Sequence, residues 1–235
     1  MPRSCAVSRR MNFAPLALAP LALALCACAT VQPREPASFW SALSSHCGNA
    51  YRGALASEDA RDAAFRGQPM IAHWAQCSDT RIAIAFHIYE GDAQATSSSS
   101  EAVGHEGGWN RSRTWIVTRE GPGAPVTLKH DHRHADSEAD AVTFYGGTSD
   151  AAGTARARDF PVDAESIALF GRPEHEGAFD ASLTNVWRIE VDPAHEPDAQ
   201  FVYQLTRRGD PSRLFRVVFD ASEPMDSVPP PAWGW

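Results

Sequence analysis

Three histidines alternate with charged residues in the segment KHDHRH (129–134). In a β-strand, residues two apart lie on the same face, so this spacing places His130, His132 and His134 together on one side. Val126 and Leu128 continue that side, which favours an inward orientation of the histidines. Imidazole groups bind metal ions, and they also act as general acids and bases because their usual pKa lies near neutrality.

The spacing limits the metal chemistry of these histidines. Neighbours on one face of a strand are about 6.6 Å apart, so His130 and His134 are about 13 Å apart at the backbone. One zinc or copper ion would be shared by His132 and one of the other two, and its remaining ligands would come from elsewhere. The alternatives are a site for an organic ligand or anion, and a structural hydrogen-bonded ladder without a ligand.

A second candidate feature is RSRTW (111–115), in which Arg111 and Arg113 would share a strand face. The turn residues 121–125 would pair this strand with the histidine strand. A site formed by both strands would be cationic and would prefer carboxylates or phosphates to a bare metal ion. Surface arginines in solvent are the alternative. The candidate ligand-binding residues are therefore Arg111, Arg113, Trp115, His130, His132 and His134.

Common catalytic motifs do not occur in the sequence. Glutamate follows His105, His175 and His195, but none of these pairs begins an HExxH motif. Neither G-x-S-x-G nor a P-loop is present. The sequence therefore identifies no catalytic residue, and an enzyme that uses the histidine strand is an alternative to a binding protein.

The segments that must position these residues are mostly strands. Apolar and polar residues alternate with period two along much of the chain after Pro69, which is typical of half-buried antiparallel strands. One short helix is expected at 58–66, between an N-cap at Ser57 and the stop at Gly67, and a helical turn at 39–43. Strands are expected near 50–56, 70–77, 82–88, 114–119, 126–134, 141–145, 160–170, 187–192, 201–206 and 215–220.

Nine or ten strands joined in sequence, with one short helix, predict an all-β fold. An antiparallel up-and-down barrel is favoured because closure removes exposed strand edges, and a β-sandwich is the alternative. Two segments are not assigned to this sheet: a loop at 91–108 and a Pro/Trp-rich tail at 222–235. Trp233 and Trp235 of the tail would dock on the domain or on a partner, and a loose end is the alternative.

The beginning of the chain has the layout of an export signal. Three arginines precede an apolar stretch of 13 residues at 13–25, which is too short to span a bilayer as a helix. The segment LCAC (25–28) resembles the lipobox of bacterial lipoproteins. That resemblance implies a signal peptide at 1–27, acyl chains such as palmitate on Cys28 and a tether at 28–38. Ala29 favours the outer membrane, facing the periplasm, and an ordinary cleaved signal is the alternative.

Composition excludes some partners. The whole chain has 21 basic and 29 acidic residues, and loss of the signal would remove three arginines and no acid, which leaves a net charge of −11. Such a domain, at 39–221, is not expected to bind nucleic acid or to dock electrostatically on anionic lipid, so the expected contact with the membrane is the lipid anchor.

Cys47 and Cys77 are expected to form a disulfide in an oxidising compartment. If the strands before and after the helix at 58–66 are antiparallel neighbours, the numbers of facing residues sum to about 124. The two cysteines satisfy this sum, so they would lie opposite each other within bridging distance. Two buried free thiols are the alternative.

Several motifs taken together, over residues 39–221, resemble a family of uncharacterised secreted bacterial proteins. These motifs are RSRTW (111–115), KHDHRH (129–134), VTFYGG (142–147), DFP (159–161) and NVW (185–187). This resemblance implies no established activity. A looser likeness to the calycins, the lipocalin and fatty-acid-binding barrels, comes from Trp40, Leu43, Gly48, Tyr51 and Gly53, and it implies a barrel with an interior ligand.

The leading functional hypothesis is thus a membrane-tethered envelope lipoprotein that binds a small ligand inside or at the mouth of a barrel. The alternatives are a metal-binding protein or histidine-dependent enzyme, and a structural or interaction protein that uses the tail.

Overall fold

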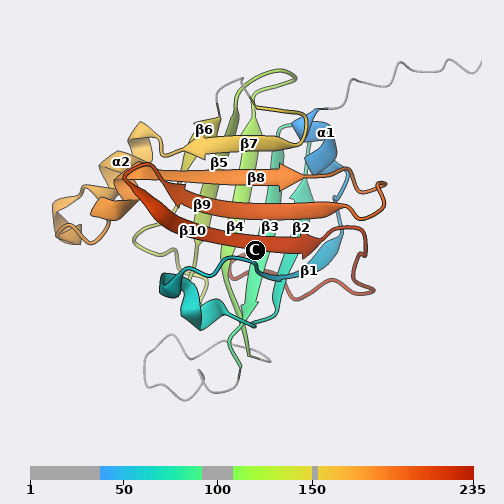
Figure 1. Cartoon of the computed structure of the whole chain (residues 1–235), viewed down its shortest axis with the longest axis horizontal. Coiled ribbons are helices and arrows are strands. Elements are labelled where there is room, and N and C mark those ends of the chain that lie inside the picture. Colours follow the sequence, from blue (N-terminus) through green and yellow to red (C-terminus); the bar gives the residue numbers. More distant parts are fainter. Residues whose placement is uncertain (1–37, 92–107, 150–152) are drawn as a thin grey trace, which may run out of the picture. The chain divides into compact units, whose positions relative to one another are not determined.

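A computed structural model describes residues 38–91, 108–149 and 153–235. The expected signal peptide, the expected lipidation site Cys28, nearly all of the expected tether and most of the loop expected at 91–108 lie outside the described residues. Ten strands form the framework of the described chain (Figure 1). They are β1 (Ala50–Leu55), β2 (Met70–Cys77), β3 (Arg81–Tyr89), β4 (Trp109–Arg119), β5 (Val126–His132), β6 (Tyr145–Ser149), β7 (Ala157–Pro161), β8 (Asn185–Val191), β9 (Gln200–Arg207) and β10 (Asp210–Asp220).

These strands form one antiparallel sheet in the order β6-β5-β4-β3-β2-β1-β10-β9-β8-β7. Strands that are consecutive in sequence pair with each other, except β6 and β7 at the two ends of this order, and the pairing of β1 with β10 joins the first strand to the last. The sheet curls into a nearly closed barrel, so the prediction of an all-β up-and-down barrel is confirmed and the sandwich alternative is wrong. Because short connections join strands that are consecutive in sequence, this order is the simplest one in which the sheet closes on itself and leaves no long exposed edge.

The barrel closes between β6 and β7 through a narrow contact. A single bridge joins Gly147 to Val162, and the backbone N–H of Asp163 donates to the carbonyl of Gly146 at 3.1 Å. A Cβ atom on Gly147 would lie 2.1 Å from the carbonyl oxygen of Pro161. Glycine at this position therefore allows the two strands to approach closely enough to close the barrel.

Alternating side chains fill the barrel interior. The strand β8 follows the expected pattern, with every second residue buried. At the centre, Trp115 stacks on Phe86 and on Tyr203, with ring centroids 4.6 Å and 4.3 Å apart. Large aromatic side chains dominate the fully buried residues, and each buries a large apolar area.

Short helices flank the two ends of the barrel. At one end lies α1 (Phe39–Ser44), begun by a capping box at Ser38, and its Leu43 carbonyl accepts a hydrogen bond from the Trp74 indole at 2.9 Å. Near the other end lie α2 (Ala164–Phe170) and the 3₁₀ helices η1 (Ala60–Phe65), η5 (Pro173–His175) and η6 (Asp180–Thr184). No described helix has the length and apolar character needed to cross a bilayer.

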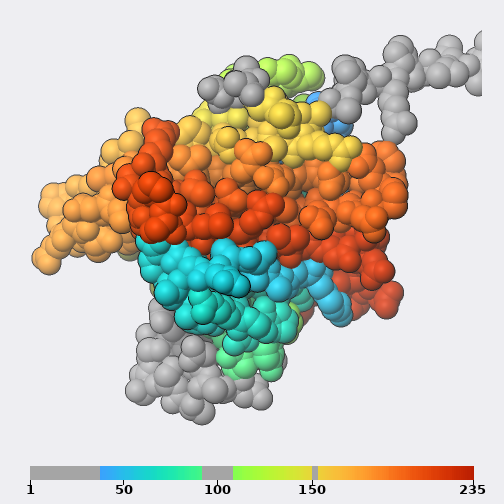
Figure 2. Space-filling model, viewed as in Figure 1, coloured from blue at the N-terminus to red at the C-terminus, as the bar shows by residue number. Residues whose placement is uncertain are grey.

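The helix expected at 58–66 is present as the 3₁₀ helix η1, but its N-cap is Asp59, whose side chain accepts from the N–H of Arg61, and not Ser57 as expected. Figure 2 shows the segment of this helix beside the segment of β10. Arg213 of β10 forms an ion pair with Asp62 of the helix. This pair is buried, with side-chain exposures of 10% and 5%. The helix therefore contributes a charged contact as well as the connection between β1 and β2.

Two expected strands are wrong. The strand expected at 160–170 ends at Pro161, because the Asp163 side chain accepts a hydrogen bond from the N–H of Ser166 and caps α2. The strand expected at 141–145 begins only at Tyr145, since Phe144 has a φ of +57°, which no extended strand adopts. In both places a local turn or cap prevails over apolar alternation.

The tail at 222–235 packs on the outside of the barrel. The N–H of Trp233 donates to the carbonyl of Arg111 at 3.0 Å, and the Trp235 indole donates to the Asp131 carboxylate at 2.9 Å. Ala232 and Trp233 are buried. Of the two expected placements of these tryptophans, docking on the domain is the one observed.

The predicted disulfide between Cys47 and Cys77 is present, with the Cα atoms 6.1 Å apart. Facing residues of β1 and β2, such as Ala50 and His73, sum to 123 rather than 124. The ladder between β1 and β2 ends at this pair, and further along β2 a bulge between Trp74 and Gln76 interrupts its pairing with β3. The cysteine pair sums to 124, so the bridge lies beyond the ladder and one position out of its register.

Candidate ligand-binding pocket

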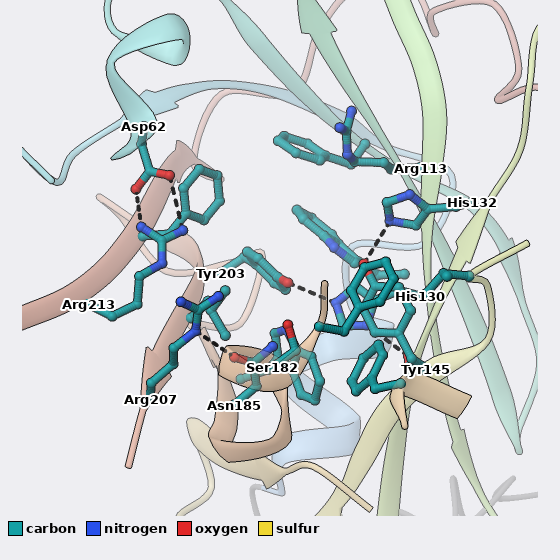
Figure 3. Close-up of a pocket in the computed structure, with 18 of the residues that line it drawn as sticks. Asp62, Arg113, His130, His132, Tyr145, Ser182, Asn185, Tyr203, Arg207 and Arg213 are labelled. Carbon is teal, nitrogen blue, oxygen red and sulfur yellow. Dashed lines mark hydrogen bonds and ion pairs between the residues drawn. The ribbon is translucent and has the colours of Figure 1, made fainter. Parts of the chain in front are cut away.

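A cavity of about 400 Å³ lies at the barrel end where β3, β5 and β9 finish and β4, β8 and β10 begin (Figure 3). Segments of η1, α2 and η6 complete its wall. Its apolar lining consists of Phe65, Phe86, Ile88, Trp115, Val142, Tyr145, Phe170, Phe179, Trp187, Tyr203, Leu205 and Phe215. Its polar lining consists of Asp62, Arg113, His130, His132, Asp140, Ser182, Asn185, Arg207 and Arg213.

The predicted pairing of the arginine strand with the histidine strand is confirmed. In the register of β4 and β5, Arg113 faces His132 and Trp115 faces His130. Directly paired residues of an antiparallel sheet lie on the same face, so all four side chains point into the cavity. Four of the six candidate residues therefore meet at one wall of the pocket.

His130 is buried among aromatic rings and uses both ring nitrogens. Its Nδ1–H donates to the carbonyl of Tyr145 at 3.0 Å, and the hydroxyl of Tyr203 donates to its Nε2 at 2.8 Å. The ring of Tyr145 stacks on His130 at 4.9 Å. Burial lowers the pKa of His130 from its usual 6.5 to about 3, so the ring is neutral at physiological pH.

His132 forms a second histidine–tyrosine pair. Its Nε2 is 3.0 Å from the hydroxyl of Tyr145. Burial, assisted by the positive charge of Arg113, lowers the pKa of His132 to about 3. Burial also raises the pKa of Tyr145 to about 12 and raises that of Tyr203 well above 10. At neutral pH the histidines and tyrosines of this wall are therefore uncharged hydrogen-bonding groups.

Three arginines line the cavity with different partners. Arg213 forms ion pairs with Asp62 and Asp59. The Nε–H of Arg207 donates to the Asn185 side chain at 3.0 Å. The guanidinium of Arg113 donates to the hydroxyl of Ser112 at 3.2 Å and forms no ion pair with a carboxylate of the described residues.

The remaining two candidate residues lie elsewhere. The expectation that Arg111 shares a face with Arg113 is wrong, because a bulge in β4 reverses the alternation between them, and Arg111 instead donates to the Pro231 carbonyl of the tail. His134 lies beyond the end of β5, where its Nε2 is 3.8 Å from the Asp140 carboxylate and its side chain is 44% exposed.

The three histidines do not converge on one point. In the described part of the chain, no group of three or more His, Cys, Asp or Glu side chains is arranged to hold a metal ion. Both nitrogens of His130 are engaged in hydrogen bonds, so a metal ion there would have to displace Tyr145 or Tyr203. The geometry gives a zinc or copper site no support.

Sequence reasoning missed several polar residues of the pocket. Tyr203 lies on the same face as Phe201 and Leu205, so alternation places it inward, but alternation does not show that it faces His130. Arg207 and Arg213 lie at the ends of strands, where alternation carries little information. Only the curvature of the sheet brings them opposite β4 and β5.

The fold and this site define an antiparallel β-barrel with an aromatic, partly polar pocket at one end. Comparison of the chain with protein-family models, with curated proteins and with solved structures found no match in any of the three.

Proposed function

We propose that this protein binds a small, mainly aromatic or apolar ligand in the barrel cavity. The cavity volume carries this proposal, since about 400 Å³ lies in the range of known small-molecule sites. Rings from both halves of the barrel line it, and a few polar groups converge on one wall. Ligand sites in proteins have this composition, in which apolar walls contribute affinity and polar groups set orientation.

The polar wall supports binding rather than catalysis. A general base must have a free lone pair near its substrate, whereas the acceptor nitrogen of His130 already receives the hydroxyl of Tyr203. Both imidazoles are neutral because burial holds each pKa at about 3, so neither can act as a general acid at neutral pH. Tyr145 and Tyr203 keep their protons for the same reason.

Filling the cavity is expected to abolish binding. Leu205 lines the pocket, so Leu205→Trp places an indole in it and should weaken binding of the uncharged fluorescent probe N-phenyl-1-naphthylamine at least tenfold. Fluorescence titration measures the affinity. The background is Cys28→Ser, which removes any acyl chain and the need for detergent, because detergent micelles also bind the probe.

Leu214→Trp is the matched control, since Leu214 is 38% exposed on β10 and does not line the cavity. It should bind the probe with unchanged affinity, and the melting temperatures of both variants report on their folding. Equal affinity of the two variants, or no binding by the unfilled protein, would contradict the proposed function.

We further propose that the domain is anchored to the outer membrane through lipid on Cys28 and faces the periplasm. The lipobox-like segment at 25–28 supports this proposal, as does the acidic mature domain, which has little electrostatic affinity for anionic lipid. Several acyl chains hold a protein far more firmly than a single chain.

Cys28→Ser is expected to move the protein from the membrane fraction to the soluble periplasmic fraction. Cys26→Ser is the matched control, because it changes a neighbouring cysteine and keeps Leu25, Ala27 and Cys28 in place. Immunoblots of the separated fractions measure the distribution. A Cys28→Ser protein that stays with the membrane would refute the anchor.

A further inference from the structure

We propose that the ligand carries an anionic group, such as a carboxylate, which binds at Arg113 while its aromatic body lies against the rings of the cavity. This inference rests on the proposed function, because it identifies the chemical class of ligand for the same cavity.

Two arginines of the pocket, Arg113 and Arg207, form no ion pair within the described residues. Asp210 and Asp59 lie near enough to Arg207 to act on its charge, whereas the guanidinium of Arg113 reaches the hydroxyl of Ser112, a neutral group. By contrast, Arg213 has two carboxylate partners, Asp62 and Asp59. Partial burial removes water from the guanidinium of Arg113, and no ion pair compensates for this lost hydration. An incoming anion therefore gains more binding free energy at Arg113 than at Arg213, whose charge is already paired.

The groups around Arg113 do not neutralise its charge. His132, its direct partner across β4 and β5, is itself a base and is neutral at physiological pH. Tyr145 and Tyr203 remain protonated, and the charge of Arg113 acts on both of them, since it opposes the burial that raises the pKa of each. This wall of the cavity is therefore positive.

Asp140 is the other acidic residue of the cavity besides Asp62. Its carboxylate accepts a hydrogen bond from the N–H of Val142 at 2.8 Å and lies 3.8 Å from His134. The side chain is 39% exposed, so water screens its charge and it lies at the rim. Neither Asp140 nor Asp62 forms an ion pair with Arg113.

The donors on this wall suit a planar anion. A guanidinium offers a fork of N–H donors that matches the two oxygens of a carboxylate. The hydroxyl of Tyr145 and the ring of His132 form a neighbouring pair that can supply one further donor. Aromatic side chains, among them Phe86, Trp115 and Trp187, offer flat surfaces for an aromatic body.

The test uses two competitors of nearly identical shape, naphthalene-2-carboxylate and naphthalene-2-carboxamide. Each is titrated against bound N-phenyl-1-naphthylamine in the full chain carrying Cys28→Ser. The carboxylate is expected to displace the probe at a concentration at least tenfold lower than the carboxamide. Equal displacement, or stronger displacement by the carboxamide, would overturn the inference.

Arg113→Gln is expected to abolish the preference for the carboxylate, so that both competitors displace the probe from this variant at similar concentrations. Arg113→Lys keeps the charge and should keep most of the preference. Arg208→Gln is the control, because Arg208 is exposed and does not line the cavity. If Arg113→Gln does not fold, the comparison of the two competitors on the unaltered pocket decides the question.

The outcomes separate the two proposals. If the probe does not bind, the proposed function fails, and this inference fails with it. If the probe binds and is displaced equally by both competitors, the cavity is a ligand site without an anion subsite, and only this inference fails.

Discussion

Reduction of the Cys47–Cys77 disulfide is expected to lower the free energy of unfolding by about 3–4 kcal/mol. The bond closes a loop with a sequence separation of 30, and the estimate follows from the chain entropy that such a loop removes from the unfolded state. For a domain of this size each kcal/mol shifts the melting temperature by roughly 2–4 °C, so the expected decrease is roughly 10 °C.

Calorimetry of the protein with and without reductant measures this effect. The double variant Cys47→Ser, Cys77→Ser should melt near the temperature of the reduced protein and should not respond to reductant. Because the ladders of β2 with β1 and with β3 hold the strands in register without the bond, the reduced protein should keep the barrel fold and bind the probe in the cavity. A melting temperature that reductant leaves unchanged would show that the loop is held without the bond.

Acidification below pH 6.5 is expected to destabilise the barrel steeply. Burial lowers the pKa of His130 and His132 to about 3 and that of His87 to about 4. In the unfolded chain all three have a pKa near 6.5, so below that pH the unfolded state binds more protons than the folded state. Their contribution to stability is therefore complete above pH 6.5 and is lost as the pH falls toward 4.

His87 offers the cleanest test because it lies outside the cavity. It is buried on β3 near the tail, and neither of its ring nitrogens has a hydrogen-bond partner within the described chain. Burial is the main cause of its low pKa. The charges of Arg111 and His73 add to it, and the nearby carbonyl of Pro230 opposes them. One such group contributes up to about 1.4 kcal/mol per pH unit.

Replacement of His87 by Leu should therefore reduce the slope of unfolding free energy against pH by about one proton between pH 6 and pH 4.5. Urea denaturation at several pH values measures the slope. Leu214→Gln is the control, since Leu214 is exposed and carries no titratable group, so this change should leave the slope unchanged. The same slope in His87→Leu and the unaltered protein would show that His87 is already protonated in the folded state.

The sequence alone was enough to predict the barrel class, the disulfide and the pairing of RSRTW with KHDHRH. The barrel class follows from the number of alternating strands. The disulfide and the strand pairing follow from information within one hairpin, because alternation tells which residues share a face and the numbers of facing residues sum to a constant. The bridge between Cys47 and Cys77 and the opposition of Trp115 to His130 are of this kind.

Other features were decided by the tertiary structure. A bulge of one residue in β4 turns Arg111 outward and leaves Arg113 facing inward, and no periodic pattern shows where a bulge will occur. The contact of Tyr203 with His130 joins residues 73 positions apart, on strands that are not neighbours in the sheet. It depends on the tilt and stagger with which the sheet closes, and these are properties of the whole barrel that no single strand specifies.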